Sequence, residues 1–76
     1  MKRFKLRAWR ARRGLTQTDI AKALGTTTTY ICLIEIGKKN PSQKFLNNFE
    51  KMFKTENTLR LFDLEESDKE KYENYK

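Results

Sequence analysis

A glycine between two short helical patterns is the feature of this sequence that most restricts its fold. The first pattern covers about residues 17–24, and the second covers about residues 28–36. Gly25 stands between them, where the absence of a Cβ lets the chain adopt a positive φ at little cost. Because only a few residues separate the patterns, the sequence predicts two neighbouring helices joined by a tight turn.

Both helices carry residues that suit their ends. Thr16 can accept hydrogen bonds from the N–H groups that open the first helix, and Asp19 places a carboxylate in its first turn. Thr27, in a run of four threonines, is the best N-cap of the second helix, because threonine suits a helix terminus better than an interior. Gly37 and Pro41 then end that helix. Local chemistry therefore predicts where each helix begins and ends.

The second helix has two different faces when successive residues are placed about 100° apart. Ile31 and Ile34 point together, and we expect them in the core. The opposite, presented face consists of Thr28, Thr29, Cys32, Leu33 and Ile36. We interpret Cys32 as a small apolar contact residue, because no neighbour in the sequence would activate its thiol.

Three further helices complete the expected scaffold. The first has Leu6 and Trp9 on its apolar face. Its basic residues, expected to point outward, are Lys2, Arg3, Lys5, Arg7, Arg12 and Arg13. Ser42 can cap a fourth helix, whose expected apolar face is Phe45, Leu46, Phe49, Met52 and Phe53. Thr58 opens a short fifth helix that carries Leu59, Leu61, Phe62 and Leu64.

Charge is distributed unevenly along the 76 residues. Residues 1–61 carry 14 basic and 4 acidic side chains, whereas residues 62–76 carry 3 basic and 6 acidic ones. A basic body attracts polyanions such as nucleic acids, although a solvated surface is the alternative interpretation of the charge alone. We interpret residues 65–76 as an acidic tail that is either disordered or an extension of the last helix.

Composition disfavours several classes of protein. One cysteine excludes an internal disulfide, and the absence of histidine disfavours both a zinc site and the Ser–His or Cys–His pairs of many enzymes. We therefore expect no enzyme, no metal and no cofactor. Since no stretch approaches the roughly 20 apolar residues of a membrane span and the N-terminus lacks the apolar core of a signal peptide, we expect a cytoplasmic protein.

A dozen residues stand at fixed offsets that one known family shares: Leu6, Arg10, Gly14, Leu15, Thr16, Gln17, Ala21, Gly25, Ile31, Glu35, Gly37 and Pro41. In this pattern the chain resembles the Cro/C1 type of helix-turn-helix protein (the XRE family), which includes lambdoid phage repressors and Cro proteins. The resemblance covers about residues 4–62. It implies an all-α, compact five-helix, lambda-repressor-like DNA-binding domain over residues 1–64, with the helix-turn-helix at about residues 16–36.

The resemblance also implies how such a domain would bind double-stranded DNA. The second helix of the motif would enter the major groove, while the loop after it and the start of the first motif helix would contact phosphates. The DNA-binding residues implied in this way are Gln17, Thr27, Thr28, Thr29, Leu33, Lys38, Lys39 and Asn40. Arg10 and Glu35 are expected to form a structural ion pair between the first helix and the recognition helix.

The expected function is sequence-specific DNA binding by a stand-alone, homodimeric transcriptional regulator, either a repressor or a phage-type switch protein. The presented face lacks the Arg, Asn and Gln side chains that discriminate bases most strongly, so we expect a T-rich site or modest specificity. The alternative is an antitoxin-like or anti-regulator module that binds a protein through Cys32, Leu33 and Ile36.

Two positions depart from the family pattern. Glu50 stands where relatives usually have an alanine against the core, and Lys54 replaces the usual glycine at the end of the fourth helix. Both departures bear on the geometry that leads into the last helix, the region that commonly forms the dimer contact in this family.

Overall fold

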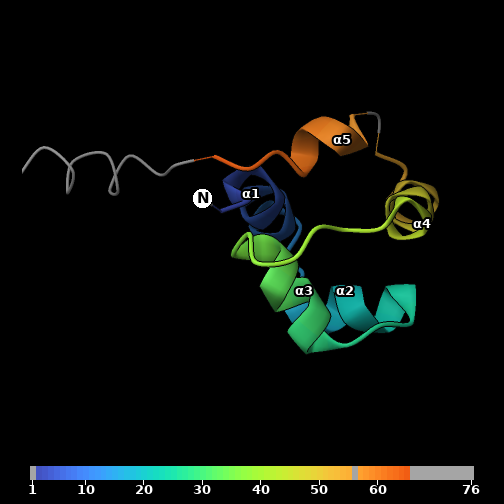
Figure 1. Cartoon of the computed structure of the whole chain (residues 1–76). Coiled ribbons are helices and arrows are strands. Elements are labelled where there is room, and N and C mark those ends of the chain that lie inside the picture. Colours follow the sequence, from blue (N-terminus) through green and yellow to red (C-terminus); the bar gives the residue numbers. More distant parts are fainter. Residues whose placement is uncertain (1, 56, 66–76) are drawn as a thin grey trace, which may run out of the picture.

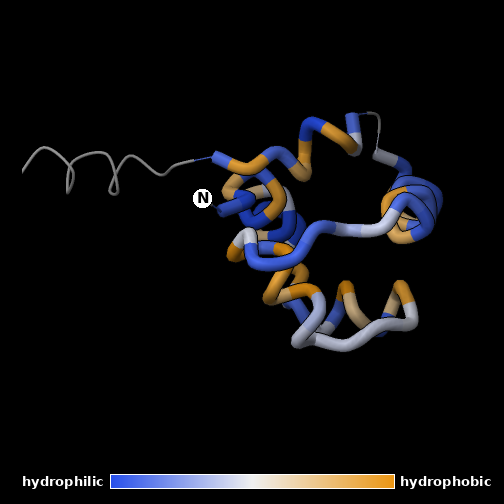
Figure 2. Tube along the Cα trace, in the orientation of Figure 1, coloured by the Kyte–Doolittle hydropathy of each residue, from blue (hydrophilic) through white to orange (hydrophobic). Residues whose placement is uncertain are grey.

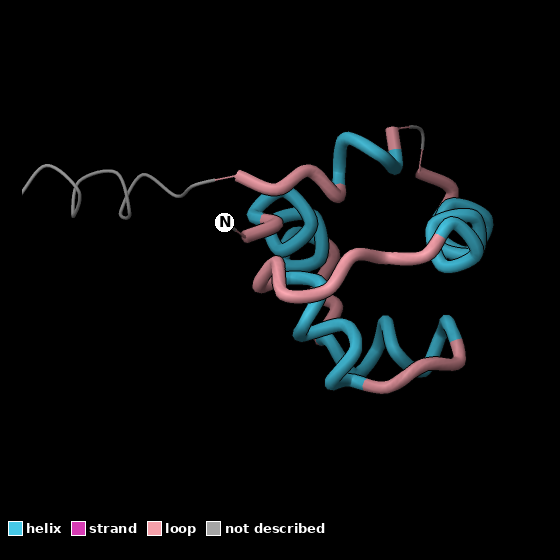
Figure 3. Tube along the Cα trace, viewed as in Figure 1, coloured by secondary structure: helices cyan, strands magenta, loops and turns pink. Residues whose placement is uncertain are grey.

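The computed structural model describes residues 2–55 and 57–65, and these ranges form helices joined by loops (Figure 3). The helices of the described residues are α1 (Phe4–Arg12), α2 (Gln17–Leu24), α3 (Thr28–Glu35), α4 (Gln43–Phe53) and α5 (Thr58–Leu61). The all-α fold and the five helices predicted from the sequence are confirmed. Of the predicted acidic tail, all but Glu65 lies outside the described residues.

The ends of α2 follow from its local chemistry, as predicted. The Thr16 hydroxyl accepts from the Asp19 backbone N–H at 3.0 Å, and the Asp19 carboxylate accepts from the Thr16 backbone N–H at 2.8 Å. Hydrogen bonding from Thr16 to the carboxylate, from its backbone N–H most strongly, holds the pKa of Asp19 below its ordinary value of 3.8. At the other end Gly25 adopts the left-handed conformation with φ of 67°. Both boundaries match the prediction.

The next two helices begin with caps of the same kind. Thr27 accepts from the backbone N–H of Tyr30 at 3.1 Å, and Ser42 accepts from that of Phe45 at 3.1 Å. Each hydroxyl satisfies one N–H group that a helix start leaves without an internal acceptor. The predicted starts are confirmed, and α3 ends at Glu35, one residue before the predicted boundary.

The helices pack around one core. α2 packs against α3, α1 contacts both α3 and α5, and α4 contacts both α2 and α5. Figure 1 shows α5 on the opposite side of the molecule from the α2–α3 pair, with α1 and α4 between them. In Figure 2 the hydrophobic positions of α2 lie on the side that faces the centre. This arrangement leaves the other side of the α2–α3 pair at the surface.

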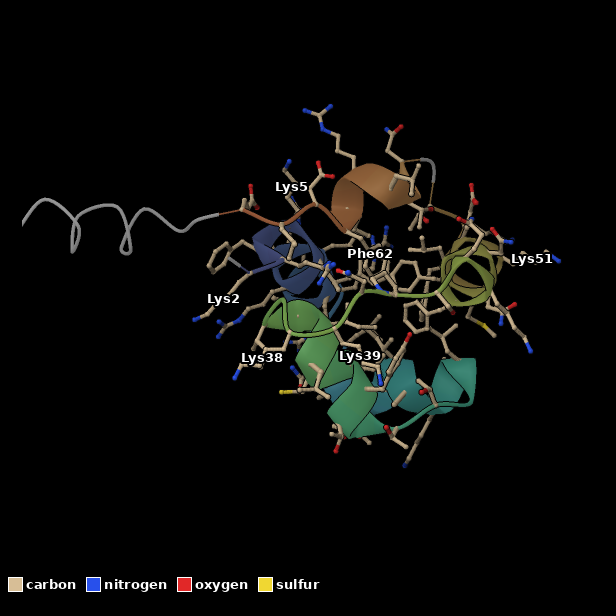
Figure 4. The ribbon with its side chains drawn as sticks, in the orientation of Figure 1. Lys2, Lys5, Lys38, Lys39, Lys51 and Phe62 are labelled. Atoms are coloured by element: carbon tan, nitrogen blue, oxygen red, sulfur yellow. The ribbon has the colours of Figure 1, made fainter. Side chains whose placement is uncertain are left out.

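Aromatic side chains from α1, α3 and α4 and from Phe62, the residue after α5, fill much of the core. The Phe49 ring lies 5.1 Å from the rings of both Trp9 and Phe62, measured between centroids. The Phe45 ring lies 6.0 Å from Phe62 and 5.3 Å from Tyr30 of α3. Figure 4 shows Phe62 pointing into the centre of the molecule. Tilted and edge-on pairs of this kind stabilise a core by about 0.5–1.5 kcal/mol each beyond the area they bury.

The expected apolar faces of α4 and α5 are partly wrong. Met52 is 53% exposed, because the rings of Phe49 and Phe53, rather than Met52, fill the contact with Trp9. On α5, Leu59 is 72% exposed. The helix is a single turn long, so it turns only part of its surface toward the core.

The two departures from the family pattern have different structural outcomes. Glu50 is exposed, so its carboxylate stays outside the core. Lys54 adopts φ of 51° and ψ of 45°, the left-handed conformation that the family's usual glycine would adopt without steric strain. Lys54 therefore ends α4 in a conformation that usually belongs to glycine.

Candidate nucleic-acid interface

α3 turns its threonines to solvent. Thr28 and Thr29 at its N-terminal end are exposed, whereas Ile31 and Ile34 are buried as predicted. The apolar members of the presented face, Cys32, Leu33 and Ile36, are half-buried. The presented face is therefore polar and exposed to solvent at its N-terminal end, whereas its apolar side chains are partly covered by the rest of the protein.

Two threonines at the start of α3, Thr27 and Thr28, are held by hydrogen-bonding contacts within the protein. The hydroxyl oxygens of Thr18 and Thr28 lie 3.2 Å apart, so α2 restrains the first residue of α3. The Thr27 hydroxyl oxygen caps α3, which leaves its hydrogen and its methyl group for other contacts. Thr18 is not recognisable from the sequence, because nothing in an exposed helical threonine indicates a partner ten residues away.

Arg10 and Glu35, the pair implied by the resemblance, form a bidentate ion pair between α1 and α3. Arg10 Nε donates to Glu35 Oε2 at 2.7 Å, and Arg10 Nη2 donates to Oε1 at 3.1 Å. The guanidinium also donates to the carbonyl of Leu15 at 3.0 Å. Only 5% of Glu35 is exposed, so the pair holds the α3 end of the motif from within the structure.

Gln17 belongs to the same network. Its side-chain nitrogen donates to Glu35 Oε1 at 3.1 Å, although a primary amide nitrogen carries a second hydrogen. Gln17 also borders a pocket of about 150 Å³ between α1, α2 and α3. The cationic side chains lining this pocket outnumber its one carboxylate, and they are Lys2, Arg3, Arg7 and Arg10. The start of α2 thus lies in a positively charged setting.

The three residues of the loop after α3 differ in what they contact. Lys38 is exposed, and its side chain extends outward from the end of α3 (Figure 4). The Lys39 ammonium lies 5.5 Å from the centroid of the Tyr30 ring, a cation–π arrangement. The Asn40 side-chain oxygen accepts from Arg3 at 3.0 Å. Of the three candidate phosphate contacts in this loop, Lys38 is the one directed away from the protein.

The expectation that Arg3 points outward is wrong, since this side chain is only 4% exposed. The backbone of its neighbour Lys2 pairs with that of Glu65 through two hydrogen bonds of 3.0 and 2.8 Å, which hold the start of the chain against the segment after α5. Carbonyl groups at the end of α3 and after α5 then surround the guanidinium, and its burial lowers its pKa. The sequence alone does not distinguish Arg3 from the other basic residues near the N-terminus, which are expected to point outward.

Within residues 2–55 and 57–65, no three His, Cys, Asp or Glu side chains gather closely enough to hold a metal ion. No helix of this part of the chain has the length and apolar character needed to cross a membrane.

Comparison with known proteins identifies the class to which this arrangement belongs. The helix-turn-helix family matches residues 6–56, so the chain belongs to that family, and its Cro/C1 type is the one predicted from the sequence. This is a family of DNA-binding transcriptional regulators, which are generally not enzymes.

Two archaeal proteins are similar to the chain. An uncharacterised HTH-type transcriptional regulator of Archaeoglobus fulgidus is 35% identical over 65 residues, which cover 84% of this chain and 93% of that protein. An uncharacterised HTH-type transcriptional regulator of Methanocaldococcus jannaschii is 45% identical over 49 residues, which cover 64% of this chain and 74% of that protein. No solved structure matches the chain significantly.

Proposed function

We propose that this protein regulates transcription by occupying a specific site in double-stranded DNA, with α3 in the major groove. The observation that carries the proposal is the exposed pair Thr28 and Thr29 at the N-terminal end of α3. In helix-turn-helix proteins this end of the recognition helix contacts the base edges, and the major groove, about 12 Å wide, admits a helix. Residues 1–64 form the DNA-binding domain in this proposal.

Phosphate contacts are proposed at both ends of the motif. Gln17 lies at the N-terminus of α2, where the helix dipole and unpaired N–H groups favour an anion, and cations line the adjacent pocket. Lys38 extends from the far end of α3. Lys39 would follow along the same backbone after releasing Tyr30, and Asn40 would donate from its amide nitrogen while its oxygen stays bound to Arg3, so their contribution is smaller.

Thymine-rich sequence is the proposed target. Threonine methyl groups and the side chain of Leu33 suit the thymine methyl, whereas threonine hydroxyls bond to almost any base. The proposed active form is a homodimer that reads two half-sites about one helical turn apart, because one helix contacts too few base pairs to define a unique site. Leu59 on α5, 72% exposed, is available for the two-fold contact. Occupancy by such a dimer suits a repressor or a phage-type switch protein.

A salt titration of binding to a duplex of random sequence tests the phosphate contacts. The logarithm of affinity should fall linearly with the logarithm of salt concentration, and Lys38→Ala should reduce the slope by about one unit. Lys51→Ala is the matched control, because Figure 4 shows Lys51 on the opposite side of the molecule from Lys38. Equal slopes for the two variants would contradict the proposed orientation.

Selection of bound duplexes from a random pool tests the reading surface. We expect T-rich half-sites, and a tight site with G·C pairs at its most discriminating positions would contradict the role given to the threonines. Weak, salt-independent duplex binding would instead favour the protein-binding alternative through Cys32, Leu33 and Ile36. Cys32 and Ile36 are half-buried, which leaves little apolar surface for a protein contact beyond Leu33.

A further inference from the structure

We propose that Arg3 is a positioning residue for DNA binding, which fixes the loop of residues 38–40 against the end of α3 and connects this loop to the segment after α5. The inference rests on the proposed function. Arg3 acts through Lys38 in this account, because its own guanidinium is enclosed by protein oxygens.

The guanidinium joins three parts of the chain through four hydrogen bonds. Nη1 donates to the carbonyl of Ile34 at 2.7 Å and to that of Lys39 at 3.1 Å, and Nη2 donates to Asn40 Oδ1 at 3.0 Å. Nε donates to the carbonyl of Phe62 at 2.8 Å. One side chain thus holds the last turn of the proposed recognition helix, the loop after it and the residue after α5.

Arg3 also completes the C-terminus of α3. The last carbonyl groups of a helix lack internal donors, and here the Arg3 backbone N–H donates to the carbonyl of Glu35 at 2.8 Å while its side chain donates to that of Ile34. The last turn of α3 contains no basic residue. The cation that favours a helix C-terminus therefore comes from Arg3.

The shape of arginine is essential to this role. Its planar guanidinium carries five hydrogens in a rigid fork, so it can donate in several fixed directions at once. A lysine would keep the positive charge, but its single ammonium cannot reach oxygens on both sides of the site. Arg3→Lys therefore separates the loss of the fork from the loss of charge.

The C-terminal partner extends the effect of Arg3 across the molecule. The Phe62 carbonyl accepts from Arg3, while the Phe62 ring packs against Phe45 and Phe49 in the core. The position of the loop that presents Lys38 thus depends on the packing of the segment after α5.

The decisive experiment combines Arg3→Lys with Lys38→Ala in the salt titration. Arg3→Lys preserves net charge, yet we expect it to lower the slope by about one unit, because the displaced loop no longer brings Lys38 to a phosphate. The double variant should lose no more slope than Lys38→Ala alone. Arg12→Lys, an equivalent change at an exposed position of α1, should leave the slope unchanged. Additive losses in the double variant, or an unchanged slope for Arg3→Lys, would overturn the proposal.

Amide hydrogen exchange of the DNA-free protein gives a readout that does not depend on the proposed function. The N–H groups of Lys38 and Lys39 both donate to the carbonyl of Leu33, at 2.9 and 3.2 Å. Arg3→Lys should raise their exchange rates at least tenfold, while the amides of α2 stay protected. If Arg3→Lys does not fold, Asn40→Ala removes one loop contact alone and should raise the same two rates. Unchanged rates would contradict the positioning role, whereas a wild-type protein that binds no DNA would contradict only the proposed function.

Discussion

The turns that end α2 and α4 have the same backbone shape but different residues. Gly25 ends α2 with φ of 67°, and Lys54 ends α4 with φ of 51°. A residue with a Cβ is disfavoured in this conformation by about 1–2 kcal/mol, whereas glycine is not. The α2–α3 pair therefore ends α2 with a locally favourable residue, whereas the left-handed conformation of Lys54 must be stabilised by tertiary packing such as that between Phe49 of α4 and Phe62. The surface proposed to contact DNA lies on the α2–α3 pair, where the residue with a positive φ is a glycine and adds no steric strain.

The largest expected effect comes from the Arg10–Glu35 ion pair, which joins α1 to α3. Arg10→Met leaves the Glu35 carboxylate buried without its cation, and we expect a loss of about 3–5 kcal/mol in the free energy of unfolding, measured with urea at neutral pH. Arg10→Met combined with Glu35→Leu should recover much of this loss. A single variant that loses less than about 1 kcal/mol would place the pair among ordinary surface ion pairs.

The next effect tests the glycine turn. Gly25→Ala should lower the free energy of unfolding by about 1–2 kcal/mol, because alanine must adopt a left-handed conformation. An added Cβ meets no atom within 4 Å, so the loss would come from the backbone alone. Urea titration measures it, and a neutral substitution would show that the turn between α2 and α3 relaxes easily to another shape.

At the turn that ends α4, a change to glycine should raise the free energy of unfolding instead. Lys54→Gly should raise the free energy of unfolding by about 0.5–1 kcal/mol, since relief of the left-handed strain exceeds the added chain entropy of glycine. The control is Lys51→Gly, inside α4, which should lower stability by about 1 kcal/mol. Thermal unfolding of both variants measures the difference, and a destabilised Lys54→Gly protein would remove the contrast between the two turns.

The smallest expected effect concerns the start of α2 and depends on pH. Because hydrogen bonds from Thr16 lower the pKa of Asp19, its contribution to stability is fully present above its ordinary value of 3.8 and is lost as pH falls through the lowered pKa. Asp19→Asn should therefore be slightly less stable than the wild type at neutral pH, and the two should converge in acid. Thermal unfolding across this range provides the measurement, and a constant difference at every pH would contradict a role for the ionised carboxylate.

Sequence separation explains which features could be predicted. The caps formed by Thr16, Thr27 and Ser42 each join residues three positions apart, so the local pattern contains both partners. The Arg10–Glu35 pair spans 25 positions, and only the family resemblance indicated it. Arg3 bonds to a carbonyl 59 positions away, and a backbone acceptor leaves no trace in the sequence.

In the candidate site, too, local features could be predicted from the sequence, whereas contacts between distant segments could not. Helical periodicity gave the exposed threonines of α3 and its buried isoleucines. It could not give the partners of Thr28 and Asn40, because both come from segments that only the tertiary fold brings near. The exposure of Met52 depended likewise on which rings of α4 meet Trp9.

The hydrogen bond from Arg3 to the Phe62 carbonyl has a consequence for how the chain folds during synthesis. The caps of α2 and α3 and the turn between them involve only nearby residues, so we expect this local structure to begin to form soon after it leaves the ribosome. The carbonyl groups at the end of α3 are paired later, because their donor, Arg3, is itself positioned by the carbonyl of Phe62, a residue that is translated much later. Contacts between distant positions form late, since closing a long loop costs entropy before it is repaid. The helix proposed to read DNA is thus among the first to begin forming, and its C-terminal end is among the last parts of the protein to gain its tertiary hydrogen bonds.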